Sequence, residues 1–359
     1  MKTTSHILHP TFRLNGLHYG ETDLIDFAKK LEEEGDDHEV SIGKFIGRWL
    51  DDTSTIEVRT SGSTGSPKLI QLEKAHMVNS ALATGTYFKV GSGTSALLCL
   101  SAEYIAGMMM LVRAMVLGWD MHVVAPEKDA LTQYDNPYDF VAMVPYQVFH
   151  SIEALHKVKQ LIIGGGKVSQ ELSDKLQRIP TEVFETYGMT ETITHIAVKR
   201  VNGLAKSQLF AALPDVKFSL DSRGCLVIAA PKVSDKEVVT NDLVELHSNT
   251  SFTLLGRYDN VVNSGGLKIH PELLEEKIAN LIDLPFIIAS EADDKFGERI
   301  ILILEHREQA VVSNYSKALS KLDKYERPKK IYTVSQFPYT ETGKIKRADV
   351  LQMLKKYKR

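Results

Sequence analysis

A loop rich in glycine and hydroxyl residues has the composition needed to hold phosphates. Nine consecutive residues form it, Thr60, Ser61, Gly62, Ser63, Thr64, Gly65, Ser66, Pro67 and Lys68. Glycines let backbone N–H groups approach an anion without a Cβ in the way, the hydroxyls donate hydrogen bonds, and the lysine adds a mobile positive charge. The loop differs from that of the common NTPases, because Ser-Pro-Lys follows its second glycine. Taken alone, the segment could equally be a solvated Ser/Gly turn.

Three later segments carry further residues suited to nucleotide chemistry. They are Glu185-Thr186-Tyr187-Gly188-Met189-Thr190-Glu191-Thr192, then residues 256–272 with Arg257 and Asp259, and finally residues 338–347 with Lys344. With the loop, their order and spacing resemble the motifs of the adenylate-forming enzymes. This superfamily contains acyl-CoA synthetases, luciferases and peptide-synthetase adenylation domains. The resemblance covers residues from about 60 to 359.

The resemblance implies a two-step reaction that uses ATP, Mg²⁺ and CoA. A carboxylate attacks the α-phosphate of ATP and expels pyrophosphate, and the acyl group then passes to the CoA thiol. Positioning and electrostatic stabilisation do most of this work. The implied catalytic residues are Lys344, Thr190 and Glu191, and Glu191 is also the implied Mg²⁺ ligand, since this cation prefers carboxylate oxygens and shares them with phosphates.

The same resemblance implies the cofactor-binding residues. ATP phosphates would lie against Thr60, Ser61, Gly62, Ser63, Thr64, Gly65 and Lys68. Adenine would stack on Tyr187, with Gly164, Gly165 and Gly166 closing its other face and Glu185, Thr186 and Gly188 nearby. Asp242 would take the ribose hydroxyls, Arg257 would lie near ribose and phosphate, and Gly265 and Gly266 would line the pantetheine channel. The triple glycine could instead be only a tight βα turn.

A hinge at Asp259 is also implied, about which the small domain would swing between the two half-reactions. Three features depart from the family pattern. Asn241 stands where the family has glycine, Asn260 stands where it has aspartate, and the segment before the phosphate loop is much shorter than usual. We therefore expect a reduced first subdomain and an acyl pocket with fewer walls.

The pattern of apolar runs predicts an α/β fold. Between about residues 56 and 186, strand-like runs alternate with helical patterns, which predicts a large domain with a mostly parallel βαβ sheet. The expected strands are 56–58, 96–100, 121–125, 140–144 and 161–163, and the expected helices are 73–88, 105–117, 146–155 and 170–177. Ligands bind at the carboxyl ends of parallel strands, and the phosphate loop is expected at such an end.

Two further regions complete the predicted organisation. Short runs at 216–220, 226–229, 243–247 and 251–255 predict a small antiparallel β subdomain. Beyond Gly266 the pattern becomes α+β, with helices 271–281, 309–322 and one from 347, and strands 286–290, 300–305 and 330–334. We expect an N-terminal domain over 1–258, with a reduced subdomain at 1–55 and the β-rich subdomain at 196–257, and a smaller mobile C-terminal domain over 259–359.

Composition narrows the class of protein. The chain has 359 residues, is 43% hydrophobic and carries a net charge of −3, so its overall charge gives no argument for nucleic acid or an anionic membrane. Cys99 and Cys225 have neither disulfide nor zinc spacing. No apolar run is long enough to span a membrane, and no export signal is visible. We expect a cytoplasmic protein, whose oligomeric state the sequence does not reveal.

The candidate residues for selecting the acid are Tyr104, Arg113 and His195. Tyr104 stands where the family commonly has histidine, and Arg113 lies within an apolar helix. A buried arginine needs an anionic partner, which could be an internal carboxylate or a ligand. His195, with Thr192 and Thr194, could line the same pocket, although His195 could equally be a histidine at the edge of the core.

The spacing around Arg113 is similar to that in o-succinylbenzoate–CoA ligases of menaquinone synthesis, which implies an aromatic dicarboxylic acid as substrate. Alternatives are an aryl- or short-acyl-CoA ligase, or an adenylation enzyme that loads a carrier protein. A non-catalytic nucleotide-binding sensor is the remaining class, and retention of the phosphate loop, Glu191 and Lys344 argues against it.

Overall fold

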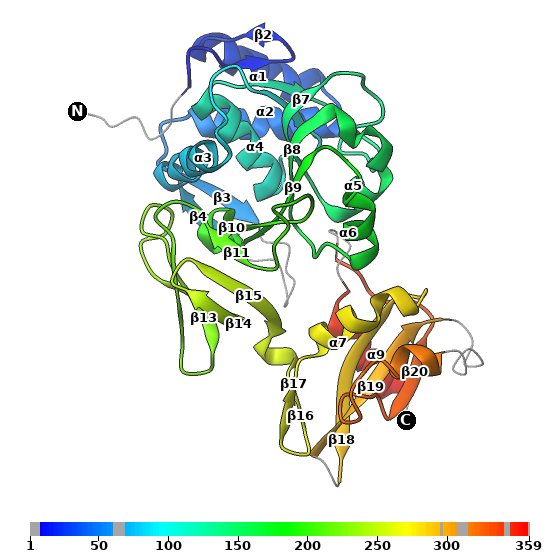
Figure 1. The fold of residues 1–359 in the computed structure, drawn as a ribbon. Helices are drawn as coiled ribbons and strands as arrows, with labels where there is room; N and C mark the ends of the chain where they lie inside the picture. Colours follow the sequence, from blue (N-terminus) through cyan, green and yellow to red (C-terminus); the bar gives the residue numbers. More distant parts are fainter. Residues whose placement is uncertain (1–7, 60–68, 295–296, 307–314, 341–344, 358–359) are drawn as a thin grey trace.

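Three sheets organise the part of the chain that the structure describes. The computed structural model describes residues 8–59, 69–294, 297–306, 315–340 and 345–357 (Figure 1). The largest sheet has 13 strands in the order β12-β13-β14-β15-β11-β10-β9-β8-β7-β5-β6-β1-β2. Their bounds are β1 (Arg13–Leu14), β2 (Leu17–His18), β5 (Ser95–Leu98), β6 (Asp120–Val123), β7 (Tyr138–Met143), β8 (Val158–Ile163), β9 (Glu182–Gly188), β10 (His195–Arg200), β11 (Phe210–Ala212), β12 (Lys217–Leu220), β13 (Cys225–Ala229), β14 (Val238–Ser248) and β15 (Ser251–Arg257).

The middle of this sheet is parallel and is covered on both faces. Strands β9, β8, β7, β5, β6 and β1 pair in parallel. Along β7, Phe140 and Ala142 enter one core, whereas Val141 and Met143 enter the core on the opposite face. The first core takes α1 (Glu21–Glu34), α2 (Asp37–Leu50), α3 (Lys74–Phe88) and α4 (Ile105–Leu117), and the second takes α5 (Pro145–His150), η1 (Ile152–Lys157) and α6 (Gln170–Leu176). Burial on both faces explains why these strands read as continuous apolar runs, and the predicted α/β class is confirmed.

The predicted antiparallel strands lie in the same sheet as the parallel ones. Strands β12 to β15 pair antiparallel with one another, and β15 reaches β9 through β11 and β10. Because β10 turns back antiparallel along β9, the residues at the end of β9 lie close to the β-rich region.

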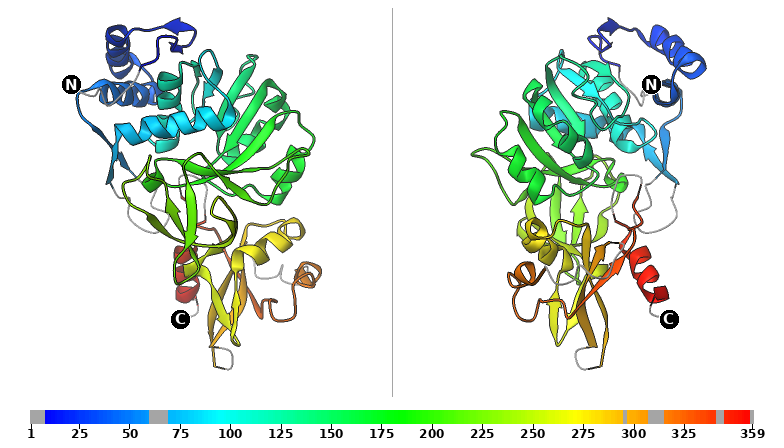
Figure 2. Two further views of the ribbon diagram at one scale, coloured as in Figure 1. Left: turned by 60° about the vertical axis from the view of Figure 1, so that its left-hand side comes forward. Right: turned by 90° about the vertical axis from the view of Figure 1, so that its right-hand side faces the viewer.

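A second sheet belongs to the C-terminal part of the chain, which Figures 1 and 2 show below the large sheet. Its strands are β16 (Val262–Ser264), β17 (Leu267–Ile269), β18 (Phe286–Asp293), β19 (Gly297–Glu305) and β20 (Lys330–Val334), in the order β17-β16-β19-β18 with β20 beside β19. One core receives side chains from α7 (Pro271–Ile278) and α8 (Ser316–Leu319), and another receives them from α9 (Arg347–Tyr357). The two sheets are joined by η3 (Tyr258–Asn260). This arrangement supports the predicted domain boundary at residues 258 and 259, which stays a prediction.

One expectation about the phosphate loop is wrong. The strand before it, β3 (Thr55–Arg59), is not part of the parallel sheet but pairs antiparallel with β4 (Leu69–Glu73) in a separate two-stranded sheet. Ile56 and Val58 are buried while Glu57 and Arg59 are exposed. This alternation is typical of a strand buried on one face, whereas a central parallel strand is apolar on both.

Several element bounds also differ from expectation. The helix expected at 146–155 is divided at Ser151 into α5 and η1, and the helix expected at 271–281 ends at Ile278, followed by η4 (Ala279–Leu281). Part of the helix expected at 309–322 lies outside the described residues, and α8 is its described remainder. No described helix is long and apolar enough to cross a membrane.

Candidate active site

The glycine triplet and the tyrosine motif lie side by side at the carboxyl edge of the parallel sheet. Strands β8 and β9 are neighbours, with Ile163 opposite Glu185. Gly165 has a φ of +76°, which favours glycine, and a Cβ on Gly164 would come within 2.8 Å of Thr186 Oγ1. The bare backbone therefore borders the motif, as a flat ligand would require, and the adenine-binding role of these residues stays a prediction.

Tyr187 is held by aromatic packing and by one hydrogen bond. Its ring lies 5.1 Å from Phe252 and 5.9 Å from Phe210, measured between centroids. Its hydroxyl donates to Asp242 Oδ2 at 2.5 Å, and burial together with Asp242 raises the pKa of Tyr187 far above its usual range. Only 8% of the residue is exposed, so this structure leaves little of the ring open to a base.

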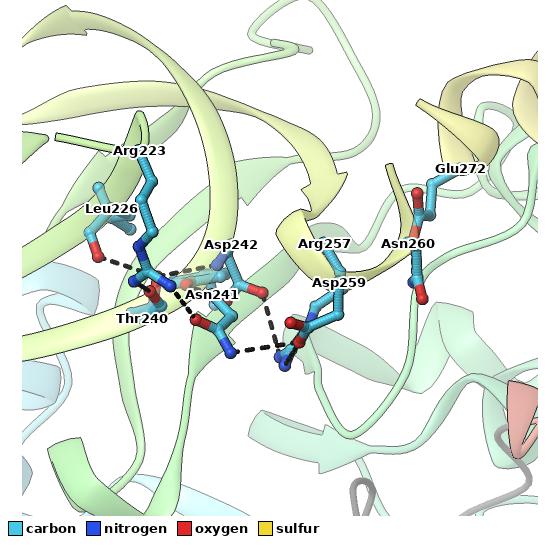
Figure 3. A network of polar contacts seen from close by, with 10 residues as sticks. Arg223, Leu226, Thr240, Asn241, Asp242, Arg257, Asp259, Asn260 and Glu272 are labelled. Atoms are coloured by element: carbon cyan, nitrogen blue, oxygen red, sulfur yellow. Dashed lines mark hydrogen bonds and ion pairs between the residues drawn. The ribbon is translucent and has the colours of Figure 1, made fainter. Parts of the chain in front are cut away.

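Asp242 and Arg257 face each other across β14 and β15. They are register partners, and Arg257 Nη1 lies 3.3 Å from Asp242 Oδ1 (Figure 3). Arg257 Nη2 also lies 3.4 Å from Asp259 Oδ2. The structure thus brings together Tyr187, Asp242, Arg257 and Asp259, which are three predicted cofactor residues and the predicted hinge.

Sequence reasoning missed Arg223, which joins this network from the turn before β13. Its guanidinium pairs with Asp221 at 2.8 Å and donates to Asn241 Oδ1 at 2.8 Å. Asn241 Nδ2 in turn donates to Asp259 Oδ2 at 3.2 Å (Figure 3). Asn241, where the family has glycine, therefore connects Arg223 to the hinge residue. No signal in the sequence indicated this contact, because a turn arginine is usually solvated.

The second departure at the hinge also has a structural reason. Asn260 Nδ2 donates to Glu272 Oε1 at 2.5 Å. A Cβ on Gly256 would come within 2.5 Å of Glu272 Oε2, so this carboxylate packs directly on the backbone of β15. An amide at position 260 can donate to Glu272, whereas an aspartate there would place two carboxylates together.

A strained turn follows the tyrosine motif. In η2 (Thr190–Thr192) the chain turns back, and Ile193 adopts φ 65° and ψ −62°, with Thr194 N–H donating to Thr192 O at 2.7 Å. This is a γ-turn at positive φ, which is unfavourable for a β-branched residue. It brings Thr194 O so close to Gly188 that a Cβ there would lie at 2.1 Å. Glycine is therefore required at position 188.

The two acidic residues of the motif differ in their surroundings. Glu185 is buried and pairs with Lys199 at 2.9 Å, so its carboxylate already has a cation. Glu191 is exposed, and within the described residues its side chain makes no hydrogen bond or ion pair. The described residues also hold no group of three potential metal ligands. Since Mg²⁺ is usually held by one or two carboxylates and substrate phosphates, Glu191 remains the predicted ligand.

Arg113 is the most unusual charged residue near this turn. It lies in α4, is 2% exposed, and burial lowers the pKa of its guanidinium from 12.5 to about 9. Its contacts are Thr84 Oγ1 at 3.3 Å, His195 Nδ1 at 3.3 Å, Thr194 Oγ1 at 3.5 Å and Met110 Sδ at 3.6 Å. None of these is an anion. Among the described residues Arg113 forms no ion pair, so the internal salt bridge is not observed in this part of the chain.

The other predicted substrate residues lie nearby in different ways. His195 is 5% exposed, begins β10 opposite Gly188, and borders a small pocket between α3 and the β-rich region. Tyr104 is the residue before α4 and is only partly buried. His195 is therefore in contact with Arg113, whereas Tyr104 lies at the N-terminal end of α4.

Several predicted residues cannot be placed. The phosphate loop, Thr60, Ser61, Gly62, Ser63, Thr64, Gly65 and Lys68, and the predicted catalytic Lys344 lie outside the described residues. The loop is flanked by the pair Arg59 and Leu69, and Lys344 is flanked by the bridge between Tyr339 and Ile345. Gly265 and Gly266 have φ of 57° and 82° and form the two-residue turn between β16 and β17. Their role towards pantetheine stays a prediction.

Fold and site together define a large α/β unit and a smaller α+β unit. In the large unit, the glycine triplet and the tyrosine motif lie at the carboxyl edge of the parallel strands. A profile of the AMP-binding enzyme family matches residues 50–227. An acyl-CoA synthetase (AMP-forming)/AMP-acid ligase II-like protein from Dyadobacter fermentans is 35% identical, with a TM-score of 0.62 over 94% of this chain and 99% of that one. The chain belongs to the AMP-binding enzyme family.

Two further comparisons concern one branch of that family. The 2-succinylbenzoate–CoA ligase of Escherichia coli is 28% identical, over 80% of this chain and 66% of its own length. The chain thus spans about two thirds of that relative. The o-succinylbenzoate coenzyme A synthetase of Bacillus subtilis, solved with ATP and magnesium ion, has a TM-score of 0.69 at 18% identity, over 82% of this chain and 69% of that one. The latter likeness shows the fold.

Proposed function

We propose that this protein is an ATP-dependent, AMP-forming acid–CoA ligase that acts on an aromatic dicarboxylic acid, with o-succinylbenzoate as the leading candidate. Membership in the AMP-binding enzyme family supports the ligase chemistry. The relative in Escherichia coli is named as a 2-succinylbenzoate–CoA ligase, which supports the substrate. Two free cysteines, Cys99 and Cys225, suit the reducing cytoplasm in which we place the reaction.

The observation that carries the substrate proposal is the buried Arg113. A guanidinium removed from water without a counter-ion costs free energy, which a bound anion recovers. An ordinary monocarboxylic acid would spend its only carboxylate on the α-phosphate of ATP. A second carboxylate on the substrate would remain available for Arg113. An aromatic dicarboxylic acid has both the charge and the apolar surface for this part of the core.

The resemblance to the family supports roles for the remaining residues. ATP and Mg²⁺ would supply the activated phosphate and its charge neutralisation, with Glu191 as the protein ligand. Tyr187 and Asp242 would hold the nucleoside, with Arg257 orienting Asp242. Lys344 would stabilise the charge that develops between the carboxylate and the α-phosphate. Asp259, tied to Asn241, would be the hinge for the second half-reaction.

The test measures pyrophosphate release by the purified chain with ATP and Mg²⁺ against a panel of acids, followed by addition of CoA. We expect preference for o-succinylbenzoate and formation of its CoA thioester. The Lys344→Ala variant should lose adenylation but still form thioester from supplied acyl-adenylate. Turnover of monocarboxylic acids alone would refute the substrate, and ATP binding without turnover of any acid would favour a nucleotide sensor.

A further inference from the structure

Five polar residues form a hydrogen-bonded group inside the main core of the large sheet. We call Ser80, Thr84, Arg113, Thr194 and His195 the Arg113 cluster. They come from α3, from α4, from the strained turn before β10 and from the first residue of β10. Ser80, Thr84, Arg113 and His195 are each at most 5% exposed. Polar side chains at this depth are costly unless their hydrogen bonds are satisfied, so the bonding pattern is informative.

The positions of the protons in this cluster follow from the donors. Arg113 can only donate, so His195 Nδ1, at 3.3 Å from Arg113 Nη2, must be an acceptor. The single hydroxyl proton of Thr84 goes to Ser80 O at 3.0 Å. Thr84 Oγ1 therefore accepts from Arg113 Nε at 3.3 Å and from His195 Nε2 at 3.4 Å. One arrangement satisfies all four contacts, a neutral His195 with its proton on Nε2.

Burial agrees with this protonation state. Desolvation, with a smaller contribution from the positive charge of Arg113, lowers the pKa of His195 well below 6.5. A protonated imidazole would also present an N–H to Arg113 Nη2, which has nothing to accept it. The uncharged tautomer is therefore the form that the site requires near neutral pH.

The cluster leaves one edge of the guanidinium without a strong acceptor. Nε is bound by Thr84, and Nη2 is shared between His195 and Thr194. The described residues give Nη1 only Met110 Sδ at 3.6 Å, and sulfur is a weak acceptor. The guanidinium is thus fixed on one side and left with unused donors on the other. Such an edge matches the charge and planarity of a carboxylate.

We propose that Thr84 and His195 are positioning residues, which orient the guanidinium of Arg113 towards the second carboxylate of the acid. His195 does so as its Nε2–H tautomer. The proposal rests on the proposed function, since it concerns the same acid pocket. Neither residue touches the reacting atoms. Their effect is on how tightly the dicarboxylic acid is recognised.

The test compares Thr84→Val, which removes the hydroxyl at nearly constant volume, with Thr84→Ser, which keeps it. Thr86→Val is the matched control, because Thr86 makes the same bond to the fourth preceding carbonyl, Leu82 O at 2.9 Å, on the exposed side of α3. KM and kcat for adenylation are measured with o-succinylbenzoate and with 4-oxo-4-phenylbutanoate and 2-butyrylbenzoate, each of which lacks one carboxylate.

We expect Thr84→Val to raise KM for o-succinylbenzoate about tenfold, as loss of an orienting hydrogen bond would. KM for the analogue that lacks the carboxylate facing Arg113 should change by less than about twofold. The kcat values should change little, and Thr84→Ser should restore KM for o-succinylbenzoate. Equal changes for all three acids, or no change, would overturn the proposal. A similar effect of Thr86→Val would also overturn it, because the cause would then be helix α3 itself.

A second readout does not depend on activity. Long-range ¹H–¹⁵N spectra of histidine-labelled protein report the tautomer of His195, whose signals are identified by their absence in His195→Asn. We expect a neutral Nε2–H ring near pH 7 in the wild type and a mixture of tautomers in Thr84→Val. An Nδ1–H or charged ring in the wild type would overturn the proposal. If the wild type turned over none of the acids, the proposed function would fail, whereas the tautomer would still decide whether the cluster is arranged as inferred.

Discussion

Replacing Arg113 with methionine should leave the stability of the protein nearly unchanged while it removes the preference for a dicarboxylic acid. A pKa lowered from 12.5 to about 9 corresponds to a penalty of roughly 5 kcal/mol on the charged guanidinium. Against this, the variant loses three charge-assisted hydrogen bonds, to Thr84, Thr194 and His195, which contribute about 1.5 kcal/mol each at their lengths of 3.3–3.5 Å. The two contributions nearly cancel, so we expect the free energy of unfolding to change by less than about 1 kcal/mol.

The assay is urea and thermal unfolding of the chain without ligand, with Arg200→Met as the control. The side chain of Arg200 is 17% exposed and pairs with Glu182 at 2.8 Å, so its loss should destabilise the protein by about 1 kcal/mol. A loss of about 3–5 kcal/mol on changing Arg113 would refute the reasoning. That is the cost of breaking a buried ion pair, and it would mean that a protein carboxylate partners Arg113 after all.

The functional half of this prediction uses the same variant. Charge-assisted hydrogen bonds are worth about 1.5–3 kcal/mol, so Arg113→Met should raise KM for o-succinylbenzoate by about 10- to 100-fold. KM for an acid without the second carboxylate should change by less than about twofold. Equal effects on both acids would show that Arg113 supports the fold of the pocket rather than the recognition of charge.

Three further outcomes are expected. Tyr187→Phe should cost about 1–2 kcal/mol in stability and raise KM for ATP, because Asp242 loses a buried donor, as unfolding and kinetics would measure. Asn260→Asp should lower stability above pH 5 and not at pH 3, since the new carboxylate would lie beside that of Glu272. A loss of stability that is independent of pH would contradict this. Finally, because the folded pKa of His195 lies well below 6.5, the unfolded chain takes up a proton that the native state refuses as pH falls through 6.5, so the stability of the wild type should fall more steeply than that of His195→Asn, by up to about 1.4 kcal/mol per pH unit.

The elements that the sequence predicted best are those whose burial follows from composition alone. Helix α4 has the expected bounds 105–117, because a run that is apolar except at Arg113 ends at Gly118, which adopts the left-handed conformation. Strand β20 also matches its expected bounds. The strand around Glu185 and Tyr187 was not predicted as a strand. Its buried and half-buried residues alternate, and the polar positions hid the periodicity.

The site was predictable as a set of residues but not as a geometry. Motif spacing assigned Tyr187, Asp242 and Arg257 to one site, and the structure places them in contact. The alternation of apolar and charged residues in β3 indicates a strand buried on one face, although the sequence alone does not reveal that it pairs with β4. No local pattern could show that Arg223 reaches Asn241, since that contact depends on strand pairing. Likewise, the sequence indicated that Arg113 needs a partner, but the absence of a described carboxylate is a property of how α3, α4 and β10 pack.

The short segment from Gly188 to His195 connects the tyrosine motif to the Arg113 cluster. At one end, the backbone of Thr194 packs so closely on Gly188 that any side chain at position 188 would clash with it. At the other end, His195 contacts Arg113. Between them, Ile193 is held at positive φ, a conformation that costs about 1–3 kcal/mol and persists here because the residue is 1% exposed in the core. A change in the Arg113 cluster that relaxes this turn would therefore also move Gly188 and its neighbour Tyr187, so for the proposed ligase we expect selectivity for the acid and binding of the nucleotide to be coupled.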